Sequence, residues 1–470
     1  MKPIPHLLTF GQALFSSGVT LCPQSDAGTG PIDDRSPFAS SSWYCGDKEF
    51  RRRHREGDGL VIRDRAPAVF TSASGARRST GTRFSRAGTS IENVRVAIVA
   101  ESFLPQVNGV TNSVLRVLEH LRDRGHEALV IAPHDEGVPE EYAGTRVIPL
   151  NAMSLPGYAD VRIGLTPTSQ FERIFADFAP DVVHLAAPFS MGYNAVLATS
   201  RMSIPSVAVF QTEIAAYATS YGWARITPVL WHRLRRIHSL ATLTLAPSTY
   251  TAQTLMERGV PRVRIWGRGV DSVRFSPDRR DERLRAELAP NGEVIIGYMG
   301  RLAPEKQVAD LAVLADIPGS RLVIVGDGPL RAEIEELLPD AYLCGKLAGD
   351  ELPRVVASMD VFVHPGELET FGQAIQEAEA CGVPVVAPAV GGPLDLIQPD
   401  VNGLLYPPGD IAEMRAHVEA LVNDPVRRDR LSAGAHAAVE HRTWSYICDQ
   451  LLAHYDDACS TVRHGELEVV

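Results

Sequence analysis

Residues 95–100 read Arg-Val-Ala-Ile-Val-Ala, and this short apolar run decides the fold class. A strand that is apolar on both faces is typical of the centre of a parallel sheet, where helices cover each side. Residues 111–124 follow with apolar side chains at helical spacing, and a second apolar strand is expected at residues 127–132. We therefore expect the chain to begin a doubly wound α/β sheet here.

The same alternation continues in two blocks. The first block has further apolar strands expected at residues 182–184, 207–210 and 242–245. The second block has apolar strands expected at residues 294–298, 322–325, 361–363 and 384–387, where it ends. The segment between them, residues 270–290, is rich in charge and has no strand pattern. We therefore predict two Rossmann-like domains of class α/β, with ligands bound beyond the carboxyl ends of their strands.

The domain boundaries follow from these changes in pattern. Residues 1–93 are rich in Ser, Gly and Arg without any period, so we expect a disordered extension or a stretch that is not translated. A basic arm for anionic lipid or nucleic acid is the alternative. The first domain is expected at residues 94–270 and the second at residues 271–441. A helix at about 442–460 is expected to return to the first domain, followed by a tail at residues 461–470.

Composition excludes several classes of protein. The 470 residues carry a net charge of -11, whereas a general nucleic-acid binder is normally basic. No stretch approaches the roughly 20 apolar residues that span a bilayer. The 6 cysteines show no C-x-x-C spacing, so neither a zinc site nor a disulfide scaffold is indicated. Reduced thiols in the cytoplasm are the simplest interpretation.

Two cations follow the first strand of the second block, in Gly300-Arg301-Leu302-Ala303-Pro304-Glu305-Lys306. Gly300 permits a close approach of the backbone to a ligand. Arg301 can grip a phosphate with two hydrogen bonds, and Lys306 supplies a compact charge. An arbitrary Arg and Lys pair would be a solvated surface feature. Their place at a strand end favours phosphate binding instead.

Two carboxylates flank a helix expected at residues 371–381. Glu369 and Glu377 stand eight positions apart, which is roughly 12 Å along a helix. A retaining glycoside hydrolase needs its carboxylates ~5 Å apart, so the two acids are expected to hold different ends of one long ligand. The amides of Phe371 and Gly372, at the helix start, can bind an anion between them. An ordinary exposed helix residue is the alternative for Glu377.

Gly109 lies in the first strand-to-helix loop and could offer a bare backbone N–H to a ligand. A nicotinamide-dependent dehydrogenase would show G-x-G-x-x-G there, but residues 101–113 contain one glycine. The sequence therefore argues against a dehydrogenase. Gly326-Asp327-Gly328-Pro329 is interpreted as a turn.

Taken together, residues 300–306, residues 326–329 and the E-x7-E segment at residues 369–377 resemble the retaining GT-B glycosyltransferases of family 4. The resemblance covers about residues 94–455 and extends to actinobacterial GDP-mannose-dependent α-mannosyltransferases that act on glycolipids. It implies two Rossmann-like domains that face each other across a cleft. The first domain would take the acceptor, and the second would take the nucleotide-sugar donor.

The resemblance also implies a role for each site residue. Arg301, Lys306 and Glu369 would be catalytic: the two cations neutralise the leaving diphosphate, and the acid binds hydroxyls of the donor sugar. Glu377 would bind the ribose. The complete donor site would consist of Gly109, Gly300, Arg301, Lys306, Glu369, Phe371, Gly372 and Glu377. Transfer would retain the anomeric configuration by front-face attack, with no cofactor and no obligatory metal.

The chain departs from the family pattern at Gln211-Thr212-Glu213, where many relatives have His-Thr-Asp or His-Thr-Glu. Glutamine forms hydrogen bonds but does not exchange protons near neutral pH, so we expect Gln211 to contact the acceptor. The resemblance predicts transfer of α-mannose from GDP-mannose to a lipid-linked acceptor. A UDP-sugar-dependent transferase, a nucleotide-sugar epimerase and a nucleotide-sugar sensor without turnover are the alternatives.

Residues 224–241 form a basic segment with apolar residues at helical spacing. Such a helix could lie on an anionic membrane. An ordinary helix with one buried stripe and one charged face is the alternative. With a lipid-linked acceptor, we expect a cytoplasmic protein with peripheral contact at the inner face of the cell membrane and no nucleic-acid partner.

Overall fold

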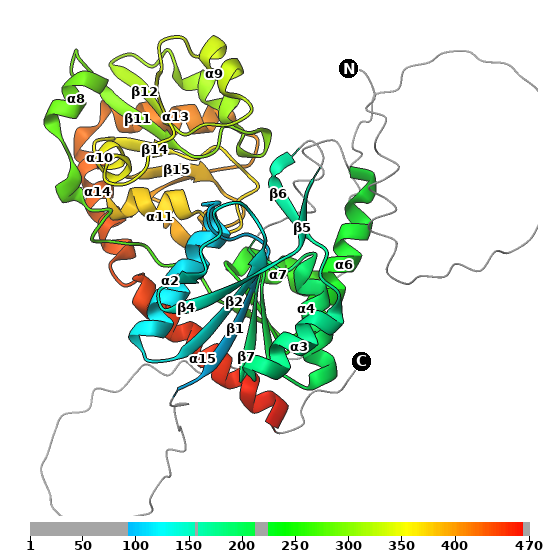
Figure 1. Cartoon of the computed structure of the whole chain (residues 1–470). Helices are drawn as coiled ribbons and strands as arrows, with labels where there is room; N and C mark the ends of the chain where they lie inside the picture. The colour runs from blue at the N-terminus through cyan, green and yellow to red at the C-terminus, as the bar shows by residue number, and fades with distance from the viewer. Residues whose placement is uncertain (1–92, 156–157, 212–223, 464–470) are drawn as a thin grey trace, which may run out of the picture. The chain divides into compact units, whose positions relative to one another are not determined.

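The computed structural model describes residues 93–155, 158–211 and 224–463, so the predictions for residues 1–92 and 464–470 lie outside it. Within the described residues the chain forms two large sheets (Figure 1). The first has eight strands in the order β10-β9-β8-β7-β1-β2-β4-β3, and the second has six in the order β13-β12-β11-β14-β15-β16. All neighbouring strands in both are parallel except β3 and β4. The predicted α/β class is confirmed.

The first sheet contains the expected strands and shorter ones at its edges. Its strands are β1 (Arg95–Ala100), β2 (Glu127–Pro133), β3 (Glu141–Tyr142), β4 (Thr145–Leu150), β7 (Val182–Ala186), β8 (Ser206–Val209), β9 (Leu243–Ala246) and β10 (Val263–Ile265). A separate antiparallel hairpin is formed by β5 (Ala152–Leu155) and β6 (Tyr158–Gly164). The helices that connect the strands of the first sheet are α2 (Gly109–Asp123), α3 (Thr168–Phe178), α4 (Met191–Met202), α6 (Thr227–Leu240) and α7 (Thr249–Glu257).

Strand β1 lies between β2 and β7, as its apolar sequence predicts. Val96 and Ile98 face a core shared with α2 and with α15 (Trp444–Arg463), whereas Ala97 and Val99 face a core shared with α3 and α4. These helices cover the two faces of the sheet in Figure 1. Alternate side chains of one strand thus build two separate cores.

Helix α2 begins two residues earlier than expected. The Asn108 side chain accepts hydrogen bonds from the backbone N–H of Val110 and Thr111, each at 3.0 Å. This N-cap satisfies amides that a helix start leaves without an intrahelical partner. Gly109 is consequently the first residue of the helix rather than a loop residue.

The second sheet follows the same plan. Its strands are β11 (Val294–Met299), β12 (Ser320–Val325), β13 (Tyr342–Gly345), β14 (Val361–Val363), β15 (Val385–Pro388) and β16 (Gly403–Tyr406). Its helices are α8 (Glu282–Leu288), α9 (Arg331–Leu337), α10 (Glu351–Ala357), α11 (Gln373–Ala380), α12 (Pro393–Leu396), α13 (Ile411–Asn423) and α14 (Pro425–Val439). The expectation that the alternation ends at residues 384–387 is wrong, because β16 follows. Its four residues are too few to show a strand period.

Two connections between the sheets lie side by side. The Val270 backbone N–H donates to the carbonyl of Arg442 at 2.8 Å, and Val270 pairs with Thr443 in an isolated parallel bridge. A Cβ on Gly269 would lie 2.5 Å from the Cα of Trp444, so glycine is required for this close approach. Beyond the second connection, α15 packs against the first sheet. There the Tyr455 hydroxyl lies 2.7 Å from Nδ1 of the buried His184.

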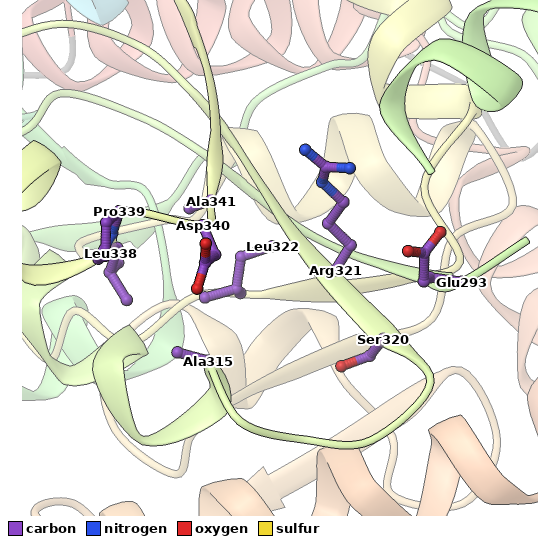
Figure 2. A pocket seen from close by; sticks show the side chains of 9 residues that line it. All are labelled: Glu293, Ala315, Ser320, Arg321, Leu322, Leu338, Pro339, Asp340 and Ala341. Carbon is purple, nitrogen blue, oxygen red and sulfur yellow. The ribbon is translucent and has the colours of Figure 1, made fainter. Parts of the chain in front are cut away.

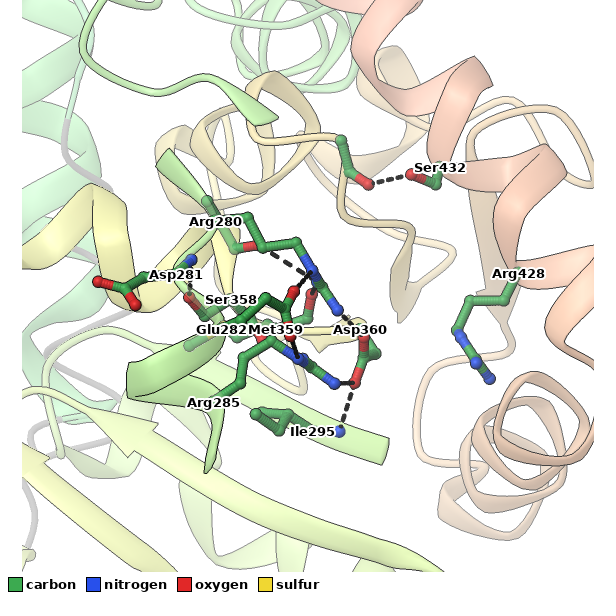
Figure 3. Close-up of polar contacts among 12 residues, drawn as sticks. Arg280, Asp281, Glu282, Arg285, Ile295, Ser358, Met359, Asp360, Arg428 and Ser432 are labelled. Carbon is green, nitrogen blue, oxygen red and sulfur yellow. Dashed lines mark hydrogen bonds and ion pairs between the residues drawn. The ribbon is translucent and has the colours of Figure 1, made fainter. Parts of the chain in front are cut away.

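The charged segment that leads into the second sheet is held by a cluster of ion pairs (Figure 3). The guanidinium groups of Arg280 and Arg285 donate to Asp360 at 3.1 and 2.9 Å. Asp360 also accepts the backbone N–H of Ile295 at 2.8 Å. Because Asp360 directly precedes β14 and Ile295 lies in β11, these charge-assisted bonds fasten the segment to two adjacent strands. The cluster therefore has a structural role.

Helix α6 corresponds to most of the basic amphipathic segment. Leu230, Trp231 and Leu234 are buried in a core with Phe210, so the apolar stripe is used inside the protein. His232, Arg235 and Arg236 lie on the exposed face. The apolar stripe is thus explained by the ordinary-helix alternative, and membrane contact stays a prediction that rests on the charged face. Across the described part of the chain, no helix has the length and hydropathy needed to cross a bilayer.

Candidate functional site

Lys306 and Glu369 meet at the carboxyl edge of the second sheet. The Lys306 ammonium donates to Glu369 Oε2 at 2.7 Å, and both side chains are largely buried. Lys306 ends a short 3-10 helix (Pro304–Lys306) after β11, and Glu369 lies in the loop after β14. Because β11 and β14 are adjacent, these loops emerge together. Gln307 joins them by accepting the backbone N–H of Glu367 at 2.8 Å.

The second oxygen of Glu369 binds backbone amides. Oε1 accepts the N–H groups of Phe371 at 3.3 Å and Gly372 at 3.0 Å. The expected helix start at residue 371 is wrong, because α11 begins at Gln373 and Gly372 adopts a left-handed φ of 101°. The Phe371 and Gly372 amides, which were expected to bind phosphate, are therefore engaged by the carboxylate. A phosphate contact there requires Glu369 to release them.

The pKa of Glu369 reflects a balance between burial and the charged and polar groups around it. Burial alone would raise the pKa of Glu369, but the Lys306 ammonium, His364 and the hydrogen bonds outweigh burial and lower it to about 2. Glu369 is consequently ionised at neutral pH. An ionised carboxylate accepts hydrogen bonds only, which suits it to binding hydroxyl groups.

Arg301 is the more exposed of the two predicted cations. Its side chain is 57% exposed, and its guanidinium lies 3.8 Å from Glu305, which is 5% exposed. The loop that carries it is supported from behind by the glycine turn of residues 326–329. A Cβ on Gly326 would lie 1.8 Å from the carbonyl oxygen of Gly300, and one on Gly328 would lie 2.3 Å from that of Leu302. The turn therefore determines where the cation loop lies.

Glu377 is half-buried on α11. Gln373 donates to Glu377 Oε1 at 3.2 Å. Burial raises the pKa of Glu377 to about 7, against the opposing influence of Gln373, Arg274 and Arg268. Glu377 is therefore partly protonated at neutral pH, in contrast to Glu369. The alternative of an ordinary exposed helix residue does not describe it.

Arg268 is a residue that the sequence analysis missed. It follows β10 and is 9% exposed. A Cβ on Gly109 would lie 2.7 Å from Arg268 Nη1, so the guanidinium lies against the bare backbone at the start of α2. The carbonyl of Arg268 accepts the Gln376 side chain of α11 at 3.1 Å. Arg268 thus connects the predicted phosphate contact Gly109 with the helix that carries Glu377. Its position after a short strand was the available signal.

His364 was also missed. It directly follows β14, is 2% exposed, and its Nε2 lies 3.7 Å from Glu369 Oε2. Burial lowers the pKa of His364 to about 4, with Glu369 raising it and Lys306 lowering it further. The rule that selected Gly300, a residue at the carboxyl end of a parallel strand, applies equally to His364.

Gln211 lies after β8 at the carboxyl edge of the first sheet and is 6% exposed. Its carbonyl accepts the hydroxyl of Thr370 at 3.4 Å. Since Thr370 follows Glu369 directly, the candidate acceptor residue is attached to the donor-site loop. Its neighbours Thr212 and Glu213 lie outside the described residues.

Within residues 93–155, 158–211 and 224–463, no group of three or more His, Cys, Asp or Glu side chains is arranged to hold a metal ion. A hollow of about 280 Å³ is lined by residues that include Glu293, Ser320 and Asp340. Figure 2 shows these side chains. It lies where β11 and β12 begin, whereas Gly300 and Lys306 follow the end of β11. The hollow is therefore separate from the candidate site.

Comparison with known proteins covers both sheets. Residues 107–274 match the model of Glycosyltransferase Family 4, and residues 279–437 match that of Glycosyl transferases group 1. A GDP-mannose-dependent alpha-mannosyltransferase of Mycobacterium tuberculosis is 48% identical over 368 residues, which cover 77% of this chain and 96% of that protein. Another of the same name, from Corynebacterium glutamicum, is 44% identical over 371 residues, with 78% and 90% covered.

Solved structures share the fold at low identity. Sucrose-phosphate synthase from Thermosynechococcus elongatus has a TM-score of 0.66 at 20% identity, with 78% of this chain and 100% of that chain covered. HepE of Anabaena in complex with UDP has a TM-score of 0.63 at 20% identity, with 77% and 100% covered. The expected GT-B fold of two Rossmann-like domains is confirmed. On the family models and the 48% identity, the chain belongs to glycosyltransferase family 4.

Proposed function

We propose that this chain transfers α-mannose from GDP-mannose to a lipid-linked acceptor. The two relatives that carry the name GDP-mannose-dependent alpha-mannosyltransferase support the donor and the sugar. The observation that carries the proposal is the bond between Lys306 and Glu369, at 2.7 Å on the carboxyl edge of the second sheet. It supports the proposal because a cation suited to phosphate and an acid suited to hydroxyl groups lie close enough to contact one ligand.

The donor would bind along this edge with its diphosphate toward the cations. Lys306 has three N–H donors on a flexible side chain, so its ammonium can turn from Glu369 toward a phosphate oxygen of the donor. The exposed guanidinium of Arg301 is free to approach a second phosphate oxygen in a bidentate manner, at the cost of its long contact to Glu305. Glu369 would accept hydrogen bonds from the mannose hydroxyls, and Glu377 from the ribose.

The reaction exchanges one bond at the anomeric carbon. The bond from C1 to the diphosphate oxygen breaks, the acceptor oxygen bonds to C1 on the same face, and GDP leaves. The acceptor's proton passes to the departing phosphate oxygen. Gln211 cannot take that proton, so the leaving group serves as the base. Lys306 and Arg301 would stabilise the negative charge that develops on the departing diphosphate. Such stabilisation by preorganised groups is usually the largest single contribution to catalysis.

The lipid-linked acceptor and the membrane location are part of the same proposal. The exposed charged face of α6, with Arg235 and Arg236, would attract anionic headgroups. The apolar stripe of α6 is buried, so this contact would be electrostatic and weakened by salt.

The test is a donor panel followed by product analysis. The purified chain is incubated with GDP-mannose, UDP-glucose or ADP-glucose and a bacterial lipid extract, and the free nucleoside diphosphate is measured. We expect release of GDP that depends on the lipid, with an α-mannosyl product by NMR. Preferential UDP release would contradict the donor assignment. Binding without release would indicate a sensor, and a nucleotide sugar of altered configuration would indicate an epimerase.

A further inference from the structure

His364 is a buried side chain whose polar atoms lack hydrogen-bond partners. It is 2% exposed, and neither ring nitrogen has a hydrogen-bond partner within the described part of the chain. Buried side-chain polar atoms are bonded in the large majority of cases, so two unbonded nitrogens on one ring require an explanation. The mechanism described above does not use this residue.

The imidazole lies beside the Glu369 carboxylate, whose two oxygens are bonded to other groups. Oε1 is occupied by the amides of Phe371 and Gly372, and Oε2 is occupied by Lys306 at 2.7 Å. His364 Nε2 lies 3.7 Å from Oε2, which is just beyond hydrogen-bond length. A movement of less than about 1 Å would bring the two atoms into hydrogen-bond contact.

The ring is neutral and has one N–H to donate. Burial lowers the pKa of His364 to about 4, so the imidazolium form is negligible near neutral pH. The ionised carboxylate beside Nε2 favours the tautomer that carries the hydrogen on Nε2. His364 is thus a neutral hydrogen-bond donor beside Glu369 Oε2, which accepts a hydrogen bond from Lys306 in this structure.

We propose that His364 is a positioning residue, which holds Glu369 in place when the Lys306 ammonium turns toward the donor diphosphate. This inference rests on the proposed function, because only a diphosphate donor would draw Lys306 away. If Lys306 left without a replacement, a buried carboxylate oxygen would lose its partner, and Glu369 would shift. His364 Nε2–H replaces that bond, so the carboxylate stays where the sugar hydroxyls need it.

The test separates the two ring nitrogens by substitution. The amide nitrogen of Gln in His364→Gln reaches the position of Nε2, whereas that of Asn in His364→Asn reaches the position of Nδ1. We expect His364→Gln to keep kcat within about threefold of wild type. His364→Asn and His364→Phe should lose roughly 10- to 100-fold in kcat, as expected when a reacting group is misplaced by about 1 Å.

The affinity for GDP distinguishes a positioning role of His364 from a packing role, because a packing role would change this affinity. GDP lacks the sugar that Glu369 binds, so its affinity should stay within about twofold of wild type in all three variants, as expected of groups that act only on the sugar. His238→Gln is the matched control, because His238 is also buried with an unbonded Nε2 and faces Thr244 rather than the site. It should change the melting temperature without changing the ratio of turnover to GDP binding.

Three results would overturn the inference. Full turnover by His364→Phe would show that no donor is needed there, and equal losses in His364→Gln and His364→Asn would show that Nε2 has no special role. Loss of GDP binding in every His364 variant would indicate that the ring only supports the pocket. Failure of the proposed function is distinguishable, because the wild-type chain would then release no GDP from GDP-mannose.

Discussion

The carboxyl edges of the two sheets each present an acid, and the two acids behave oppositely. Glu101 directly follows β1 and uses Oε1 to accept the N–H groups of Phe189 at 2.7 Å and Gly192 at 2.9 Å. Glu369, after β14, uses Oε1 in the same way for Phe371 and Gly372. Burial raises the pKa of Glu101, and its amide bonds offset this only in part. The pKa of Glu369 instead falls to about 2.

The difference is the cation on the other oxygen. Lys306 lies 2.7 Å from Oε2 of Glu369, and its charge and hydrogen bond, together with His364 and the Phe371 amide, outweigh the desolvation of the acid. Glu101 binds amides at the start of α4, whereas Glu369 is held charged beside Lys306. A carboxylate at a strand end is therefore indicative of a binding site chiefly when a cation lies beside it.

The sharpest test of this comparison removes each partner in turn. We expect Glu369→Ala and Lys306→Ala to lower mannose transfer by about 100- to 1,000-fold, the range found when a group that stabilises developing charge is removed. Both proteins should stay folded by circular dichroism. Glu101→Gln, the matched change in the other sheet, should leave kcat within about threefold of wild type, since capping groups affect stability first. Wild-type turnover in Lys306→Ala would contradict the site.

Arg301 should contribute less than Lys306, because it is more exposed and acts through water-screened charge. We expect Arg301→Ala to raise KM for GDP-mannose by roughly 10-fold, and Arg301→Lys to recover only part of this because it cannot bind in a bidentate manner. Initial rates at two salt concentrations measure the effect. A salt-independent KM in wild type would contradict the phosphate contact.

The two acids should also affect stability with opposite pH dependence. The lowered pKa of Glu369 adds stability above its unfolded value near 4.5, and this is lost as pH falls toward 2. The raised pKa of Glu101 means that its contribution decreases as pH rises above 4.5. Urea unfolding across this range should show that Glu369→Gln removes the stability gained with rising pH, by up to about 3 kcal/mol, and that Glu101→Gln removes the stability lost with rising pH. If both substitutions changed the pH dependence of the unfolding free energy in the same direction, the opposite behaviour of the two acids would be contradicted.

The smallest expected effect concerns the turn that presents the Glu369 amides. Gly372 has a φ of 101°, and a Cβ there would lie 2.9 Å from Leu396 and 3.1 Å from Ile375. Gly372→Ala should cost about 1–3 kcal/mol of unfolding free energy from strain at this φ. Gly144→Ala is the control, because its φ is also positive but nothing lies within 4 Å of the added Cβ. A smaller cost for Gly372→Ala than for Gly144→Ala would contradict the crowding argument.

Long apolar strands and local motifs were predictable because their signals lie in neighbouring residues. Strand β1 and the E-x7-E segment are of this kind, and Lys306 was found through its position after β11. Arg268 and His364 were not found, because each follows a three-residue strand and carries no motif. The start of α11 was placed two residues early, because the sequence does not reveal that Glu369 takes up the preceding amides.

Hydrophobic period and residue order were enough to establish two α/β sheets. The strand-end rule was enough to choose Lys306, and the position before a helix was enough to choose Glu369. These depend on local geometry, which every strand and helix obeys. Folding alone determined the direction in which each acid's pKa shifts, because the pKa of Glu101 and that of Glu369 depend on groups distant in the chain. Lys306 is 63 positions from Glu369, and only the adjacency of β11 and β14 brings their charges within 2.7 Å.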